Sequence, residues 1–143
     1  MPSPELVLNQ AFAKLAMDVG PALPAGYGQG SVTTTAVLLL MVGQEFNRAA
    51  DVRAKENAAM RALFADAAKL VEGELRAAVE AAATTKDADL TIATLDRANA
   101  ELKKTLIALQ TRVEEAKLGA VQLRIAKMLQ GFAAGRQIFL PAL

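Results

Sequence analysis

The chain has 143 residues, of which 53% are hydrophobic, a formal net charge of +1, and neither cysteine nor histidine. Without these two residue types the chain lacks disulfides, thiol nucleophiles and the usual ligands of zinc and haem, so we expect no metal and no cofactor. A net charge this close to zero argues against a nucleic-acid partner.

Length and hydropathy predict one domain over residues 1–143. The most apolar stretch, residues 36–43, is much shorter than the about 20 residues that a membrane-spanning helix needs. Residues 1–10 contain no basic side chain of the kind that opens a secretory leader. We therefore expect a cytoplasmic protein without an integral membrane segment.

Helices are predicted along the chain, because alanine, leucine and long unbranched polar residues dominate its composition. The first helix is expected over about residues 4–18, where Ser3 can cap it and Pro4 lacks the N–H that a first turn leaves unpaired. The glycines and prolines of residues 19–31 predict a loop.

Two long helices are expected next, over about residues 32–83 and 88–134, joined by a turn at residues 84–87. Apolar positions keep helical spacing across both helices, and only isolated glycines interrupt them. The charged stretch around Asp51 leaves open whether the first of these helices breaks there. Residues 135–143 are expected to form a tail.

The last predicted helix carries a heptad stripe between Ile92 and Leu123, which is typical of a helix packed against partner helices. One polar residue, Asn99, interrupts the stripe. It either fixes the register or the oligomeric state of the helix, or it lies in water at the edge of the contact. The stripe itself is compatible with both interpretations.

Two long helices joined by a short turn predict an antiparallel hairpin, in which residue i faces roughly residue 170 − i. The predicted fold is all-α. It is a long, coiled-coil-like antiparallel helical hairpin with a short N-terminal helix, forming a helical bundle that dimerisation completes.

The half of the hairpin next to the turn carries pairs of adjacent apolar residues, which present more apolar surface than a two-helix seam can bury. A second copy of the chain is the simplest cover, so we expect a homodimer. The predicted interface residues are Leu63, Phe64, Leu70, Val71, Asn99, Leu106 and Ile107.

The densest polar cluster contains Glu45, Arg48 and Asp51, which form a possible polar ligand site for a phosphate or carboxylate held by arginine. The favoured interpretation is a solvated helix flank, because successive members have the i,i+3 spacing of helix-surface ion pairs. No residue is predicted to be catalytic.

These patterns favour a non-enzymatic structural or interaction protein, a self-associating helical bundle that acts as an adaptor or assembly module. The alternative is a small-molecule or lipid-binding bundle with an apolar pocket near the N-terminal helix. That pocket would be bounded by the first helix, by residues 37–46, and by Val121, Ile125 and Met128. An enzyme built on the polar cluster is the least supported of the three.

Overall fold

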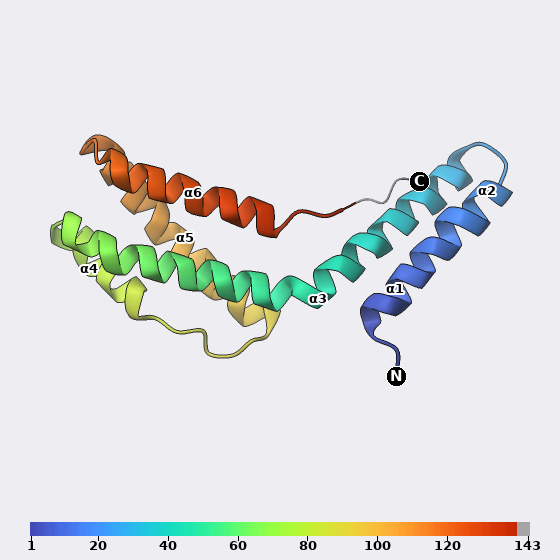
Figure 1. The fold of residues 1–143 in the computed structure, drawn as a ribbon, viewed down its shortest axis with the longest axis horizontal. Helices are drawn as coiled ribbons and strands as arrows, with labels where there is room; N and C mark the ends of the chain where they lie inside the picture. The colour runs from blue at the N-terminus through green and yellow to red at the C-terminus, as the bar shows by residue number, and fades with distance from the viewer. Residues whose placement is uncertain (140–143) are drawn as a thin grey trace. The chain divides into compact units, whose positions relative to one another are not determined.

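The structure is a computed structural model that describes residues 1–139, and its secondary structure there is helical, without a β-strand (Figure 1). This confirms the predicted all-α bundle with a short N-terminal helix. Residues 140–143, the end of the predicted tail, lie outside the described residues. The elements in chain order are α1 (Pro4–Ala13), a π-helical turn (Lys14–Val19), α2 (Gly20–Ala22), α3 (Tyr27–Ala67), a 3-10 turn (Ala68–Leu70), α4 (Gly73–Thr84), α5 (Ile92–Glu115) and α6 (Gly119–Gly135).

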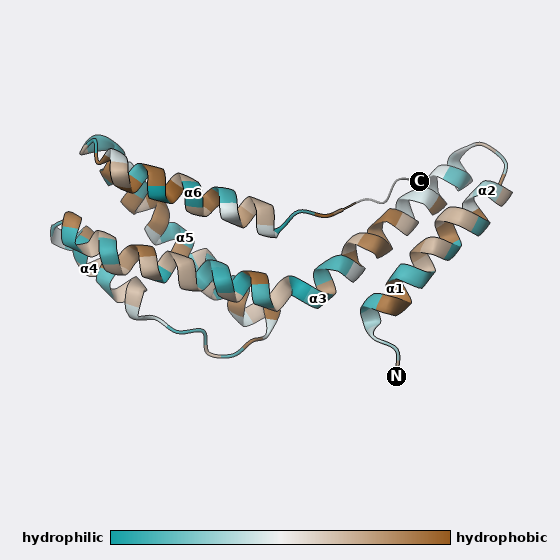
Figure 2. Cartoon of the chain, viewed as in Figure 1, coloured by the Kyte–Doolittle hydropathy of each residue, from teal (hydrophilic) through white to brown (hydrophobic). Residues whose placement is uncertain are grey.

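The chain forms two compact units. The hairpin unit comprises Met1–Ala49 together with Ile138 and Phe139, and the bundle unit comprises Ala50–Gln137. Hydrophobic residues occur in both units, including the N-terminal part of α3 and the length of α6 (Figure 2). Each unit has its own core.

Helix α1 begins at the predicted residue, Pro4, because the Ser3 hydroxyl accepts a hydrogen bond from the Leu6 amide at 3.2 Å and so caps the helix. The predicted loop 19–31 is wrong: the helical path continues to the end of α2, and α3 already begins at Tyr27. The Gln29 side-chain amide donates to the Gly20 carbonyl at 3.4 Å and joins the two arms across the short turn between them. Gly28 and Gly30 thus lie within α3 despite the weak helix preference of glycine.

The seam of the hairpin unit is thin. Its buried side chains are Phe12, Ala36 and Leu40. A β-carbon on Gly43 would lie 3.1 Å from Asn9 Oδ1 and 3.2 Å from Leu8 Cβ, so glycine at this position permits the close approach of α1.

The predicted helix over residues 32–83 does not break near Asp51, since α3 is a continuous helix of 41 residues. It breaks instead at Val71 and Glu72, which have extended backbone conformations. Gly73 follows with a φ of +63°, a left-handed conformation that favours glycine. The chain therefore turns back, and α4 packs Val79 into the core that α3 lines.

The predicted helix over residues 88–134 also breaks. Lys117 has a φ of 55°, its amide donates to the Glu114 carbonyl at 3.1 Å, and the Leu118 amide donates to the Val113 carbonyl at 3.0 Å. These two bonds form a Schellman motif that ends α5, with lysine at the position where glycine is usual. The sequence concealed the break because it lacks that glycine.

The predicted turn at residues 84–87 is longer in the structure and ends at Thr91, whose hydroxyl caps α5 by accepting from the Thr94 amide. We define residues 85–91 as the linker. Asp87 lies in this linker, and its carboxylate is paired with the Arg61 guanidinium at 2.7 Å.

The predicted facing of residues i and 170 − i is wrong. Arg53 pairs with Asp96 and Asn57 with Asn99, separations of 43 and 42 residues, so α3 and α5 run parallel. Because each predicted long helix folds back on itself, the bundle unit has four helical segments, each antiparallel to the next one in the chain. The side chains of its buried core are Met60, Leu63, Phe64, Ala67, Ala68, Val71, Val79, Leu102, Leu106, Leu109, Val113, Val121 and Ile125.

Candidate functional site

A chain of buried polar side chains crosses the bundle unit at the end opposite the two helix breaks. It starts at Glu56 on α3, whose side chain is 3% exposed. Arg136 donates to this carboxylate from Nε at 2.6 Å and from its terminal nitrogen at 2.8 Å, and the Asn99 amide donates to it at 3.1 Å. The carboxylate therefore has three donors from two other segments of the chain.

The same chain of bonds continues through Asn57. Its side-chain oxygen accepts from Asn99 at 2.9 Å, and its nitrogen donates to the Asp87 carboxylate at 3.0 Å and to the Leu95 carbonyl at 3.2 Å. Arg61 donates hydrogen bonds to the Asp87 carboxylate from both terminal nitrogens, at 2.7 and 3.0 Å. We name this set the polar network; its members are Glu56, Asn57, Arg61, Asp87, Asn99 and Arg136.

The polar network keeps its carboxylates ionised. Burial would raise the pKa of Glu56, but the hydrogen bonds and charge of Arg136, the hydrogen bond of Asn99 and the charge of Lys103 together hold that pKa below its ordinary value. The hydrogen bond from Arg61 lowers the pKa of Asp87 in the same way, against the effect of burial. The hydrogen bonds of the network link α3 to α5, to the linker and to Arg136.

Asn99 is therefore buried and hydrogen-bonded within a single chain, and it does not lie in water at the edge of the contact. The predicted interface residues Leu63, Phe64, Val71 and Leu106 are also buried in the core of the bundle unit, as is Asn99. The reason given for assigning them to a second chain is wrong, because α4 and α6 fold back and supply the missing cover.

Two predicted interface residues remain at the surface. Leu70 is 53% exposed in the 3-10 turn, and Ile107 is 66% exposed on α5. Single exposed apolar side chains are common on folded proteins, so neither marks an interface by itself.

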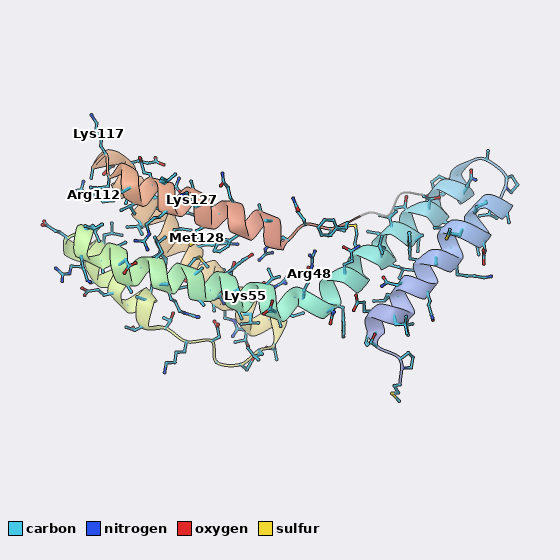
Figure 3. The ribbon with its side chains drawn as sticks, viewed as in Figure 1. Arg48, Lys55, Arg112, Lys117, Lys127 and Met128 are labelled. Carbon is cyan, nitrogen blue, oxygen red and sulfur yellow. The ribbon has the colours of Figure 1, made fainter. Side chains whose placement is uncertain are left out.

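The predicted polar ligand site is not brought together as a pocket. Asp51 is paired with Lys55 at 2.7 Å, and both side chains are more than half exposed. Arg48 and Lys55 both project from α3 (Figure 3). A pocket of the hairpin unit is lined by Arg48 with Glu5, Gln44, Asn47 and Phe139, but by neither Glu45 nor Asp51.

The residues predicted to line an apolar pocket near the N-terminal helix are packed into hydrophobic cores instead. Val121 and Ile125 are buried in the bundle unit, and Met128 packs against that core. The apolar face of α1 is used at Phe12 in the seam of the hairpin unit.

Sequence reasoning overlooked one surface, which we name the apolar stripe. It consists of Leu38, Val42 and Phe46 on α3, which are 54%, 53% and 56% exposed. Their i, i+4, i+8 spacing puts them on one face of the helix. The signal is present in the sequence, but the run around them is so apolar that it predicts complete burial.

Among residues 1–139, no group of three or more histidine, cysteine, aspartate and glutamate side chains is placed to hold a metal ion. Over the same residues, none of the helices combines the length and the apolar character that crossing a membrane demands.

Comparison of the chain with known protein-family models, with curated proteins and with solved structures gives no match.

Proposed function

We propose that the chain is a non-enzymatic, self-associating helical module, and that two copies pair through the apolar stripe of the hairpin unit. The observation that carries the proposal is the exposure of Leu38, Val42 and Phe46 on one helix face. Burying the exposed half of each side chain contributes about 1 kcal/mol. A two-helix hairpin has one seam, so this face needs further helices to cover it.

A second copy of the hairpin unit is the partner that fits this face best. Four antiparallel helices form the smallest closed helical bundle, and two hairpins supply them. A two-fold contact packs the apolar stripe of one copy against the same stripe of the other, so the interface needs no second apolar surface on the chain. The product of such a module is an assembled surface, as in an adaptor or assembly factor.

The carboxylates of the polar network support a non-enzymatic role. Glu56 and Asp87 are both held ionised by arginine and asparagine partners, and both have a lowered pKa. A general acid or base at neutral pH needs a pKa near the working pH, and neither group is tuned in that direction. With no histidine or cysteine in the chain, the commonest catalytic side chains are also missing.

Light scattering on the full chain tests self-association. We expect the wild type to have twice the mass of one chain and Phe46→Asp to have the mass of one chain, because aspartate on the stripe places a charge in an apolar contact. Ile107→Asp is the matched control, since Ile107 is equally apolar and exposed but lies on α5. A monomeric wild type, or a dimer that only Ile107→Asp disrupts, would overturn the proposal.

A further inference from the structure

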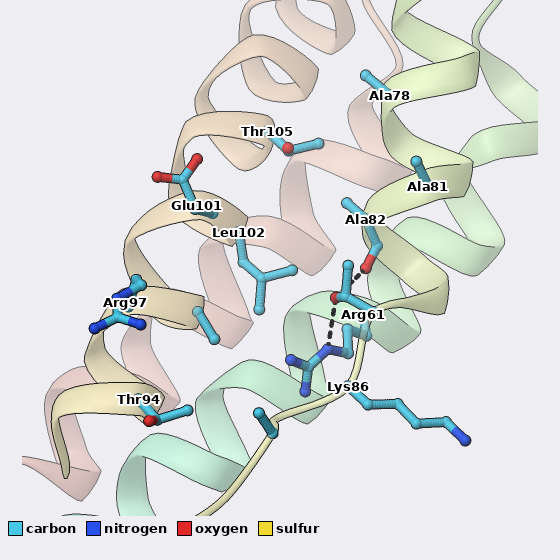
Figure 4. Close-up of a pocket in the computed structure, with 13 residues that line it drawn as sticks. Arg61, Ala78, Ala81, Ala82, Lys86, Thr94, Arg97, Glu101, Leu102 and Thr105 are labelled. Atoms are coloured by element: carbon cyan, nitrogen blue, oxygen red, sulfur yellow. Dashed lines mark hydrogen bonds between the residues drawn. The ribbon is translucent and has the colours of Figure 1, made fainter. Parts of the chain in front are cut away.

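An open pocket of about 500 Å³ lies in the bundle unit between α4 and α5, with Arg61 of α3 at its base and the linker at one end (Figure 4). This volume is in the range of sites that hold small organic ligands. The lining residues of α5 run from Thr94 to Thr105, a rise of about 16 Å along the helix. The pocket is therefore elongated along the two helices.

The pocket exists because α4 presents small side chains toward α5 at this level. Ala78, Ala81 and Ala82 form its wall on α4, facing Leu102 on α5 (Figure 4). Val79, on another face of α4, is fully buried in the core, so the two helices are held together without filling the pocket.

The basic residues of the pocket lie in its linker half, where Lys86 of the linker and Arg97 of α5 project to opposite sides (Figure 4). Lys86 and Arg97 are exposed there, and neither takes part in an ion pair within residues 1–139. Arg61 uses its Nε–H on Thr85 and its two terminal nitrogens on Asp87, which leaves two of its five N–H groups for another acceptor.

The opposite end of the pocket is apolar. Ala78 and Ala81 lie there with Thr105, away from the three cations (Figure 4). The acid that lines the pocket, Glu101, is paired with Lys104 at 2.7 Å and points away from α4 (Figure 4). The pocket thus has a cationic end and an apolar end.

We propose that this pocket binds a linear aliphatic carboxylate, with the carboxylate at the linker end, between Lys86 and Arg97, and the chain along the alanines of α4. An anion is selected there because Lys86 forms no ion pair within residues 1–139 and Arg61 keeps two N–H groups beyond its pair with Asp87, while Arg97 shares its charge with Asp89. The length and the small apolar wall select an unbranched body over a bulky one. The site is independent of the apolar stripe and of self-association.

Calorimetric titration of the full chain with dodecanoate tests the proposal. We expect one site per chain, binding of dodecyltrimethylammonium at least about tenfold weaker, and no detectable binding of acetate. The first comparison isolates the charge of the head group, and the second isolates the contribution of the aliphatic chain.

Two matched pairs of variants locate the site. Lys86→Gln/Arg97→Gln should weaken dodecanoate binding about tenfold or more, whereas Lys69→Gln/Lys127→Gln, with the same loss of charge elsewhere, should change it less than about twofold. Ala81→Leu should weaken binding similarly by filling the pocket, while Ala77→Leu on the same helix should not. All six substituted positions are exposed, so we expect these variants to fold.

Three results would overturn the proposal. The first is equal binding of the cationic and anionic amphiphiles, which means adsorption to apolar surface alone. The second is equal loss of binding in a pocket variant and its control. The third is loss of dodecanoate binding in Phe46→Asp with retention in Ala81→Leu, which places the ligand on the hairpin unit.

Discussion

The two units of this protein bury their apolar helix faces to different extents. The bundle unit folds its chain back at Val71–Glu72 and again at Lys117, and four helical segments bury a common core. The hairpin unit has one seam and leaves the apolar stripe half exposed. The number of helices that surround a face, rather than its hydrophobicity, decides whether that face closes within one chain.

The largest difference between the units should appear when one phenylalanine is removed from each. Phe64 is fully buried in the bundle core, so Phe64→Ala should lower the free energy of unfolding by about 3–5 kcal/mol. Phe46→Ala should lower it by less than about 1 kcal/mol in dilute solution, since Phe46 is 56% exposed. Urea unfolding followed by circular dichroism measures both. Equal costs for the two variants would contradict the assignment of Phe64 to a closed core.

A second pair of variants separates the polar network from an ordinary surface ion pair. Arg136→Ala removes two hydrogen bonds from the buried Glu56 carboxylate and should cost about 2 kcal/mol. Arg124→Ala removes the pair with Asp66, in which both side chains are more than half exposed, and should cost less than about 1 kcal/mol. The same denaturation experiment compares them. If the two costs are equal, the network does not hold the bundle together.

The polar network should also make the bundle unit sensitive to acid. The pKa of Glu56 is lowered from 4.5 and that of Asp87 from 3.8, so the folded state binds fewer protons than the unfolded state. Their stabilisation is fully present above these unfolded values and is lost as pH falls through the lower folded values. Urea unfolding between about pH 6 and pH 3 should show this loss, and Glu56→Gln should flatten it. An unchanged slope in Glu56→Gln would refute the role of Glu56.

A substitution in the turn between α5 and α6 should change the free energy of unfolding least, and it should raise that free energy. Lys117 holds a left-handed conformation that costs a non-glycine residue about 1 kcal/mol, so Lys117→Gly should raise the free energy of unfolding by about that amount. The converse change, Gly73→Ala, should lower it, because Gly73 also has a positive φ. Thermal and urea unfolding detect both signs. A destabilised Lys117→Gly would mean that the lysine side chain outweighs its backbone strain.

Part of this fold could be predicted from sequence because the signals are local. Ser3 and Pro4 mark the start of α1, and the heptad stripe with Asn99 marks a buried face of α5. The two breaks could not be predicted. Helical spacing continues past Val71, and the left-handed residue that ends α5 is Lys117, which carries no sequence signal for a turn.

The polar network and the pocket of the bundle unit depended on those breaks, so they could not be predicted either. The doublets Leu63–Phe64 and Leu70–Val71 present more apolar surface than the two helices of a single hairpin can bury. The sequence therefore indicated that further helices must cover them. The cover comes from the same chain once α4 and α6 fold back. Likewise, the pocket between α4 and α5 requires the turn at Gly73, which brings the alanines of α4 opposite Leu102.

Hydrogen exchange read by mass spectrometry, as a function of protein concentration, tests the contrast between the units most directly. Over an about hundredfold range of concentration, protection of α3 around Leu38–Phe46 should rise with concentration, because association stabilises only the unit that is incomplete alone. Protection around Phe64 and Leu109 in the bundle core should not change. Concentration-dependent protection of the bundle core, with constant protection of the hairpin unit, would contradict this account.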